Sequence, residues 1–369
     1  MTEMQSIHGE PSWILSNDSV ELAVSRRAGH MAPVVFRTGG REFSPYSLSP
    51  WTREESNPEL PELLRVLRGD FFCMPFGVSK EFPPHGHPAN SDWDLISQSA
   101  DELRLSISGG VDGATIEKVV SVRRGETAVY QDHIIRGWEG RYNYGNHPIL
   151  DFSGIPEGQG RLSVSPFRWG SVYRGVFADP SIGEHGVMES GALFTDLKAV
   201  PLAAGGTTDV TRYPVRSGCE DLVMMVSEPA TEAQPFAWSA AVMDGYVWFS
   251  LKNPADFPTT LFWLSNGGRQ AEPWSSRHFG RVGIEEVYSH FFDGLEISRE
   301  DRLAPEGIPT TREFHKDEAV SVRIVQGIVP VPAGFQTVAS IVPDGPGRVT
   351  LQDENGQTVT AKVDWSYVL

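Results

Sequence analysis

The chain has 369 residues, 40% of them apolar, which is enough to bury a large hydrophobic core. Its formal net charge is −17 and no run of basic residues stands out, so the composition argues against a nucleic-acid partner and against an anionic membrane surface. A neutral, unphosphorylated small molecule fits this charge better than a phosphorylated one.

The two cysteines, Cys73 and Cys219, are too few for a disulfide framework and are expected to be buried thiols. Residues 1–13 have neither the basic start nor the apolar run of a signal peptide, and no stretch approaches the ~20 apolar residues of a membrane helix. These features predict a cytoplasmic protein and leave its oligomeric state open.

Alternation of apolar and polar residues, the pattern of half-buried antiparallel strands, dominates the chain. One short helix is predicted over residues 57–67, where leucines recur on one face and Pro61 suits the first turn. The pattern is weak between residues 162 and 200. Strands are predicted over residues 19–25, 31–36, 94–98, 103–108, 114–122, 127–136, 221–227, 236–243, 246–252, 260–265 and 280–287.

Tight turns join several of these strands. Gly125 can take a positive φ in the turn after residue 122, and Asp244–Gly245 and Asn355–Gly356 are hairpin signals. Four more strands are predicted beyond residue 318.

The many strands and turns, together with 37 glycines and 27 prolines, predict an all-β fold with few short helices. No linker or internal repeat stands out. We therefore expect one large antiparallel β-sandwich domain over residues 1–369, with residues 300–369 as an additional C-terminal β segment.

Histidines in two places are candidates for proton transfer. His85 lies in a Gly- and Pro-rich loop, residues 68–93, of the kind that more often binds or reacts than packs into a core. His147 lies at the expected end of a strand, where Pro148 restricts its backbone to extended conformations and would hold the side chain rigidly.

Two adjacent carboxylates, Glu285 and Glu286, occupy a predicted strand whose alternation sends them to opposite faces. One can point into a pocket while the other meets solvent, and the sequence leaves open which one does. A carboxylate and an imidazole supply a proton acceptor and a donor without a metal or cofactor. Several aromatic residues could line such a pocket, although core packing is expected for most of them: Phe71, Phe72, Phe76, Trp93, Trp263 and Trp274.

In order along roughly residues 15–295, these motifs resemble those of the aldose 1-epimerases (mutarotases), nearest the hexose-6-phosphate branch. The Asn146-His147-Pro148 and Gly283-Ile284-Glu285-Glu286 stretches match the family's strand-ending His-Pro pair and its glutamate in an apolar strand. The first motif is matched by Arg68-Gly69-Asp70, Pro75-Phe76-Gly77, and His85-Gly86 followed at the family spacing by Trp93.

The resemblance implies a galactose-mutarotase-like β-supersandwich that interconverts the α and β anomers of an aldose. Glu285 would then take the proton from the C1 hydroxyl, His147 would protonate the ring oxygen, and His85 would help to hold the ring. Arg68 and Asn90 are predicted to contact the sugar. Trp93 is expected to pack beneath the loop or against the ring.

The sequence also departs from the family pattern. The arginine that the hexose-6-phosphate branch uses for phosphate falls on Ala89, which together with the charge of −17 disfavours a sugar phosphate. Asp70 stands where the family pattern has a glycine, and Glu286 stands where the pattern has a proline after the glutamate.

Three other classes of function fit parts of the sequence. A cupin-like metal enzyme would use His85, His87 and Asp92 as ligands. A non-catalytic sugar-binding protein could keep the sandwich without using the acid–base pair. A glycan-cleaving enzyme could pair a carboxylate or histidine with Tyr142 or Tyr144, which lie just before His147.

Overall fold

The computed structural model describes residues 4–52 and 59–369. Antiparallel strands dominate, and the α-helices among these residues are two short ones, α1 (Glu62–Val66) and α2 (Gly294–Arg299), which confirms the all-β prediction. The predicted helix over 57–67 is shorter than expected, and its residues 57 and 58 lie outside the described residues. Pro61, expected in the first turn, instead precedes Glu62, the first helical residue, with an extended backbone (ψ 140°).

The described residues form three large sheets, which we call the N-terminal, large and pocket sheets. The N-terminal sheet has the order β1 (Gln5–Ile7), β2 (Glu10–Ser16), β3 (Val20–Ser25), β4 (Met31–Thr38), β5 (Arg41–Phe43). The large sheet has the order β19 (Arg212–Tyr213), β14 (Gly160–Val164), β21 (Ala237–Val242), β22 (Tyr246–Lys252), β26 (Val320–Pro330), β10 (Ala128–Arg136), β9 (Thr115–Val122), β8 (Glu102–Ser108), β7 (Asp94–Gln98).

The pocket sheet has the order β16 (Leu193–Phe194), β15 (Phe167–Val172), β20 (Cys219–Ser227), β23 (Thr259–Asn266), β24 (Arg281–Tyr288), β12 (Tyr144–Asn146), β6 (Phe72–Cys73), and β13 (Ile149–Asp151) pairs with β24 off this path. The smaller sheets are β11 (Gly140–Tyr142) with β25 (Arg312–Phe314), β17 (Val200–Pro201) with β18 (Thr207–Thr208), and a C-terminal sheet of β27 (Val338–Pro343), β28 (Arg348–Asp353) and β29 (Thr358–Lys362).

The strands predicted from alternation all form. Each end that was predicted lies within two residues of the observed end. Gly125 and Gly356 adopt the positive φ that their turns require, +76° and +84°. Very short strands such as β6, β12 and β13 were not predicted, because two or three residues are too few to show an alternation of apolar and polar side chains.

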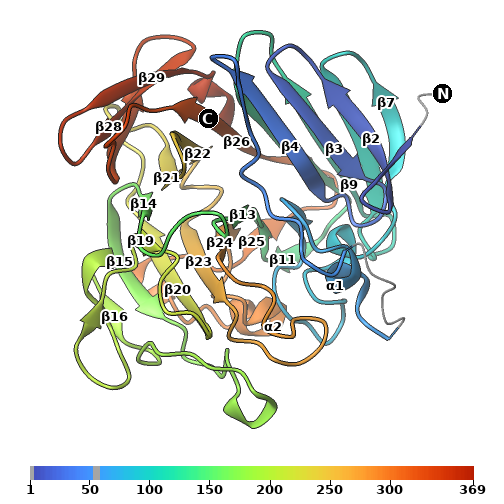
Figure 1. Ribbon diagram of the computed structural model, residues 1–369. Coiled ribbons are helices and arrows are strands. Elements are labelled where there is room, and N and C mark those ends of the chain that lie inside the picture. Colours follow the sequence, from blue (N-terminus) through green and yellow to red (C-terminus); the bar gives the residue numbers. More distant parts are fainter. Residues whose placement is uncertain (1–3, 53–58) are drawn as a thin grey trace.

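One face of the large sheet packs against two other sheets. A single hydrophobic cluster joins Trp248 and Ile328 of the large sheet to Leu22 of the N-terminal sheet and to Phe262 and Ile284 of the pocket sheet. Figure 1 shows the N-terminal strands in blue beside the large sheet, with the orange strands β23 and β24 below. This packing buries the inner face of the pocket sheet and leaves its outer face for other contacts.

The C-terminal sheet covers the opposite face of the large sheet. Ile341 and Leu351 pack there against Trp238 of β21 and Phe249 of β22, and Figure 1 shows β28 and β29 in red beside β21 and β22. The tail beyond residue 318 thus contributes to two sheets. Its first strand, β26, pairs with β22 and β10 in the middle of the large sheet, and its later strands form the C-terminal sheet. The prediction of one domain over residues 1–369 stays a prediction.

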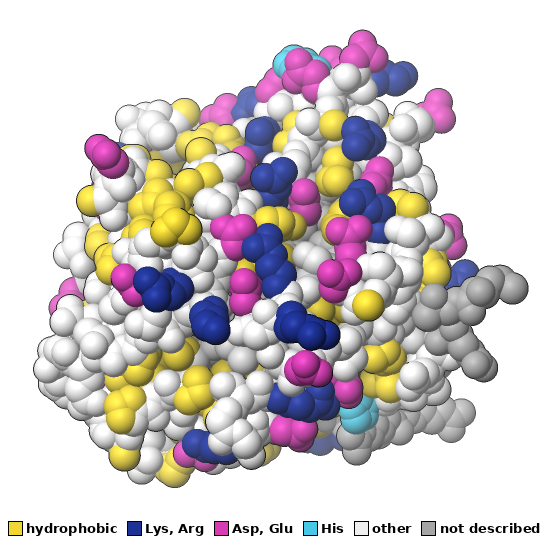
Figure 2. Space-filling model, turned by 90° about the horizontal axis from the view of Figure 1, so that it is seen from above, with side chains coloured by type: hydrophobic (Ala, Val, Ile, Leu, Met, Phe, Trp, Pro, Cys, Tyr) yellow, Lys and Arg dark blue, Asp and Glu magenta, His cyan; other side chains and the backbone are white. Residues whose placement is uncertain are grey.

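On the face seen from above in Figure 2, Lys and Arg side chains lie interspersed with Asp and Glu. This face therefore offers no continuous basic surface to a polyanion. Among residues 4–52 and 59–369, no helix combines the length and the apolar character needed to cross a bilayer. Cys73 is buried, as predicted, whereas Cys219 is half-buried, and both are free thiols.

Candidate active site

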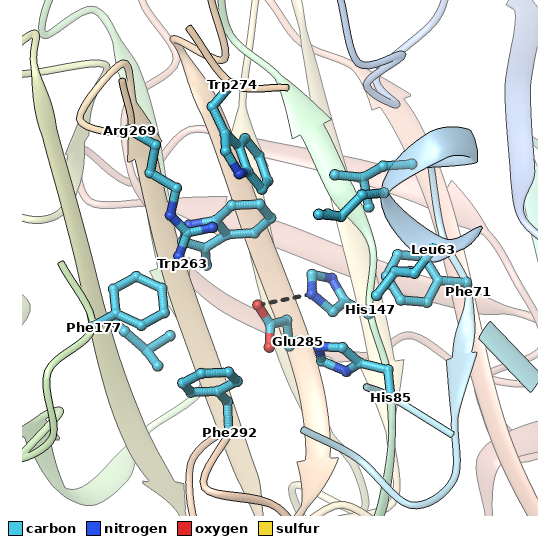
Figure 3. A pocket seen from close by; sticks show the side chains of 13 residues that line it. Leu63, Phe71, His85, His147, Phe177, Trp263, Arg269, Trp274, Glu285 and Phe292 are labelled. Atoms are coloured by element: carbon cyan, nitrogen blue, oxygen red, sulfur yellow. Dashed lines mark ion pairs between the residues drawn. The ribbon is translucent and has the colours of Figure 1, made fainter. Parts of the chain in front are cut away.

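A pocket with a cavity volume of about 100 Å³ lies on the outer face of the pocket sheet. Its floor comes from β20, β23 and β24, and α1 closes one side. Figure 3 shows the side chains that line it converging on Glu285 and His147. The lining residues are Leu63, Leu64, Leu67, Phe71, His85, His147, Phe177, Leu222, Trp263, Arg269, Trp274, Glu285 and Phe292.

His147 owes its position to an interruption between two short strands. β12 pairs Asn146 with Glu286, and β13 pairs Ile149 with Gly283, so His147 and Pro148 lie opposite the residues between them on β24. The backbone N–H of His147 donates to the carbonyl of Phe71 at 2.9 Å, and its ring stacks on the Phe71 ring with centroids 4.6 Å apart. These contacts fix the imidazole at the pocket floor.

Strand alternation on β24 separates the two glutamates, as predicted, and Glu285 is the one in the pocket. Glu286 does not meet solvent, contrary to the prediction. It is fully buried between the sheets, where Lys252 Nζ lies 2.5 Å away and the hydroxyls of Ser239 and Thr260 donate to it at 2.6 and 2.7 Å. The carboxylate of Glu286 is therefore paired within the core and does not face the pocket.

In the pocket, His147 Nε2 lies 3.4 Å from Glu285 Oε1, and the two residues are only 5% and 3% exposed. Burial raises the pKa of Glu285 from 4.5 to about 8. Burial, reinforced by the nearby His85, lowers the pKa of His147 well below its ordinary value. At neutral pH the pair therefore holds one proton, which rests on the carboxyl group.

His85 reaches the pocket from a loop that folds back on itself. Its backbone N–H donates to the Gly77 carbonyl at 2.7 Å, and its Nδ1 accepts from the Gly77 N–H at 3.4 Å. The neutral ring therefore carries its proton on Nε2. The centroids of the His85 and His147 rings lie 5.3 Å apart, and burial lowers the pKa of His85 to about 4.

A glycine makes this close loop possible. Gly86 adopts φ +76°, and a Cβ there would lie 1.9 Å from the carbonyl oxygen of Met74. His85 itself has φ +62°, a conformation that non-glycine residues adopt at a cost. The backbone at His85 is thus locally strained in the conformation that places its imidazole in the pocket.

Arg68, Asn90 and Trp93, the residues considered for substrate binding, do not line the pocket. Arg68 is 1% exposed and donates to the backbone carbonyls of Val66, Ile7 and His8. The guanidinium is thus used to hold chain segments together, and we do not retain the predicted sugar contact.

Asn90 and Trp93 support the loop that carries His85. Asn90 Nδ2 donates to the carbonyls of Pro84 and Gly86 at 2.7 and 2.8 Å, and its Oδ1 accepts from the backbone N–H of Leu63 in α1. Trp93 is fully buried and donates to the Pro88 carbonyl at 3.0 Å, so it packs beneath the loop, one of the two placements expected for it.

Arg269 is a pocket residue that the sequence did not reveal. It follows β23 after two glycines, and its guanidinium carbon lies 4.8 Å from the Trp274 ring centroid and 5.4 Å from that of Trp263. Its Nε is 3.4 Å from Glu184 and 4.0 Å from Glu220. A charged residue just after the end of a strand is a signal, but a weak one, because many surface arginines share it.

The aromatic residues divide between pocket and core. Phe71, Trp263 and Trp274 line the pocket, whereas Phe72 and Phe76 do not. The sequence did not indicate that Phe177, Phe292, Leu222 and the leucines of α1 would complete the lining.

No protein-family model matches this sequence, and no curated protein matches it either. Solved structures do match. A protein of Escherichia coli K12, provisionally named an aldose 1-epimerase, has a TM-score of 0.58 at 14% identity over 88% of this chain and 100% of its own. A Klebsiella pneumoniae protein with the same provisional name has a TM-score of 0.59 at 12% identity, over 89% and 82% of the two chains.

A galactose mutarotase related enzyme from Lactobacillus acidophilus has a TM-score of 0.55 at 10% identity, over 87% of this chain and 98% of its own. The fold of this chain is galactose mutarotase-like. At such identities the likeness establishes the fold alone, and the predicted nearness to the hexose-6-phosphate branch stays a prediction.

The galactose mutarotase-like fold excludes the cupin alternative. His87 Nδ1 lies 3.3 Å from the Ser91 hydroxyl and Asp92 pairs with Arg26 on the surface, so neither joins His85 in a metal site. Within the described parts of the chain, no three His, Cys, Asp or Glu residues are grouped closely enough to hold a metal ion.

The tyrosines considered for glycan cleavage lie elsewhere in this galactose mutarotase-like fold. The hydroxyl of Tyr144 donates to the Asp256 carbonyl at 2.9 Å, and the ring of Tyr142 packs against Trp138. Neither side chain lines the pocket.

Proposed function

We propose that this protein is a carbohydrate-active isomerase that interconverts the α and β anomers of an aldose by opening and reclosing the sugar ring. The buried pair of His147 and Glu285, 3.4 Å apart in a pocket that also holds His85, supports this function best. A donor and an acceptor on adjacent atoms of a ring acetal are what this reaction needs.

In the proposed reaction, the pair first moves its shared proton from the carboxyl group to the imidazole, which leaves the net charge of the site unchanged. Glu285 then takes the proton of the O1 hydroxyl while His147 donates its proton to the ring oxygen O5. The C1–O5 bond breaks, its electrons stay on O5, and C1 becomes a carbonyl. The open-chain sugar thus faces a protonated carboxyl group and a neutral imidazole.

Reclosure reverses these transfers on the other face of C1. Rotation about C1–C2 presents the opposite face of the carbonyl, the O5 hydroxyl attacks it, His147 recovers the proton from O5, and Glu285 returns its proton to O1. The protonation state that burial favours is the one present during the open-chain stage. Burial therefore stabilises the stage at which both groups are neutral.

His85 is proposed to hold the ring or the C1 oxygen by donating from Nε2, because its Nδ1 already accepts from Gly77. The apolar side chains around the pair exclude water, which strengthens each of these hydrogen bonds. The small molecule is proposed to be an unphosphorylated sugar, since Ala89 is fully buried at the position where a phosphate-binding arginine was considered.

Polarimetry on freshly dissolved single anomers of free aldoses tests this function. The protein should accelerate the approach to the equilibrium rotation for at least one sugar, without new reducing ends from a glycan panel. Binding without acceleration would indicate a sugar-binding protein, and new reducing ends or unsaturated products would indicate cleavage. Either result would overturn the proposal.

A further inference from the structure

The described lining of the pocket has few polar groups for a sugar site. Nine of its thirteen residues are leucine, phenylalanine or tryptophan, and the polar ones are His85, His147, Arg269 and Glu285. The indole N–H of Trp263 is already used, because it donates to Glu220 at 2.9 Å. A free aldohexose, by contrast, presents five hydroxyls and a ring oxygen.

The polar lining residues are distributed unevenly: Arg269 lies on one side of the pair of Glu285 and His147, and His85 lies near Phe71 on the other. Figure 3 shows Arg269 and Trp263 on the side of Glu285 away from Leu63, whereas Leu63 and Phe71 lie beyond His147. Arg269, whose Nε lies 3.4 Å from Glu184 and 4.0 Å from Glu220, is the charged residue of the described lining on that side and the candidate donor to sugar hydroxyls there. On the opposite side, the described lining residues of α1 and the residue after it are leucines: Leu63, Leu64 and Leu67.

This asymmetry orients a ring whose reacting atoms are placed by the proposed function, on which the inference rests. With C1 at Glu285 and O5 at His147, the ring continues from O5 to C5 and its substituent C6. The C6 end then meets Leu63 and Phe71, and the hydroxyls of C2 and C3 extend toward Arg269.

We propose that the substrate is a 6-deoxyaldose, whose C6 methyl group packs against the leucines of α1. A C6 hydroxyl placed against Leu63, Leu64 and Leu67 would lose its hydrogen bonds to water without gaining a partner from these side chains. An apolar pocket discriminates against an added hydroxyl by about 10²-fold at most. A pentose avoids that cost but leaves the methyl site unfilled, and one missing carbon is worth about tenfold or more.

Two matched series of sugars test this proposal by saturation-transfer NMR. One is 6-deoxy-D-galactose, D-galactose and L-arabinose, and the other is 6-deoxy-D-glucose, D-glucose and D-xylose. Within each series the ring configuration is the same and only C6 changes. In at least one series, kcat/KM for the 6-deoxy sugar should exceed that for both others by about tenfold or more. Equal or better exchange of the hexose in both series would overturn the proposal.

A pair of variants tests the wall itself. Leu64 is half-buried, so Leu64→Gln can offer a partner to a C6 hydroxyl without placing an amide in the core. It should reduce the preference for the 6-deoxy sugar over the hexose at least fivefold, whereas the apolar Leu64→Met should preserve it. An unchanged preference in Leu64→Gln, with the protein folded, would count against the leucine wall.

Binding separates this inference from the proposed function. Quenching of the fluorescence of Trp263 and Trp274, both in the pocket, reports sugar affinity without turnover. If no sugar is exchanged but 6-deoxy sugars bind at least tenfold more tightly than their hexoses, the proposed function fails and the substrate class stands. If neither exchange nor binding favours the 6-deoxy sugars, the substrate class fails.

Discussion

Glu285 and Glu286 are neighbours on one strand, yet their carboxyl groups experience opposite environments. Glu286 has Lys252 at 2.5 Å and two hydroxyl donors, whereas Glu285 has, among the residues that the structure describes, the imidazole of His147 at 3.4 Å. A buried carboxyl group without a cation prefers to be neutral, which is why burial raises the pKa of Glu285 to about 8. The difference between the two residues thus arises from their partners rather than from their depth.

The raised pKa predicts a specific dependence of stability on pH. The folded protein holds the Glu285 proton more tightly than the unfolded chain, so its contribution is complete below pH 4.5 and is lost as the pH rises to about 8. The stability of Glu285→Gln relative to wild type should therefore rise by a few kcal/mol across this window. Urea unfolding at several pH values measures this difference.

The matched control for that experiment is Glu232→Gln, at an exposed position. Its difference from wild type should stay within about 0.5 kcal/mol at every pH. A difference between Glu285→Gln and wild type that does not change from pH 5 to pH 8 would show that Glu285 ionises normally.

The same groups predict the pH dependence of anomer exchange. The reaction needs one proton on the pair, and that proton is lost above pH about 8. The kcat/KM for exchange should therefore be flat from about pH 6.5 to 8 and then fall about tenfold per pH unit, as measured by NMR after correction for the uncatalysed rate. A rate that keeps rising through pH 9 would contradict this assignment.

At the residue level, sequence reasoning identified the histidines and the glutamate of the pocket but not the groups around them. Alternation predicts opposite faces for Glu285 and Glu286, but it cannot tell which face bears the pocket. That depends on the second sheet and on Lys252, which is distant in sequence. Arg68 illustrates the converse, because its motif suggested a ligand contact and its surroundings supply backbone carbonyls instead.

At the scale of elements, the loop that carries His85 depends on Gly86. A Cβ at this position would combine a φ of +76° with an approach of 1.9 Å to the Met74 carbonyl oxygen. Gly86→Ala should therefore lower the free energy of unfolding by about 2–5 kcal/mol and reduce kcat by displacing the neighbouring His85. Urea unfolding and exchange assays measure the two effects.

Gly125→Ala is the matched control, because Gly125 has the same φ of +76° and a Cβ added there would meet nothing within 4 Å. This change should cost about 1–2 kcal/mol and leave kcat unchanged. Equal losses of stability in the two variants would mean that the contact with Met74 has no effect.

Elements with a clear period could be predicted, and elements defined by their partners could not. β9 and β10 form as expected because each displays several alternations around a turn at Gly125. The positions of β12 and β13, and thus of His147, depend on pairing with β24. Such pairing is non-local, and a sequence pattern does not contain it.

At the scale of the whole molecule, the ion pair of Lys252 and Glu286 links two sheets. Lys252 belongs to β22 of the large sheet, and Glu286 belongs to β24 of the pocket sheet. Removing one partner leaves the other as an uncompensated buried charge. Lys252→Met should therefore lower the free energy of unfolding by about 3–5 kcal/mol, measured by denaturant unfolding.

Adding Glu286→Gln to Lys252→Met should recover part of that loss, because the amide stays close to the hydroxyls of Ser239 and Thr260 without a charge. The exposed pair of Lys198 and Glu354 is the control, and Lys198→Met should cost at most about 1 kcal/mol. A buried-pair variant no more destabilised than the surface variant would contradict the role of this contact.

The arrangement of the sheets is the part of the fold that the strand pattern left open. Strand counting indicated a sandwich with extra strands at the C-terminus. It could not indicate that β26 lies in the middle of the large sheet while β27–β29 cover its outer face. Every residue of β22 is buried, as is β26 from Ile324 to Val329, so the side-chain pattern of these strands carries no signal for a particular neighbour.

The most direct test of the account is anomer exchange by saturation-transfer NMR on the best sugar, comparing wild type with Glu285→Gln and His147→Ala. Both variants should fold and should lose about 10²–10⁴-fold in kcat, while Glu232→Gln should match wild type. Exchange at the wild-type rate in either folded variant would contradict the central claim that this buried pair moves the protons.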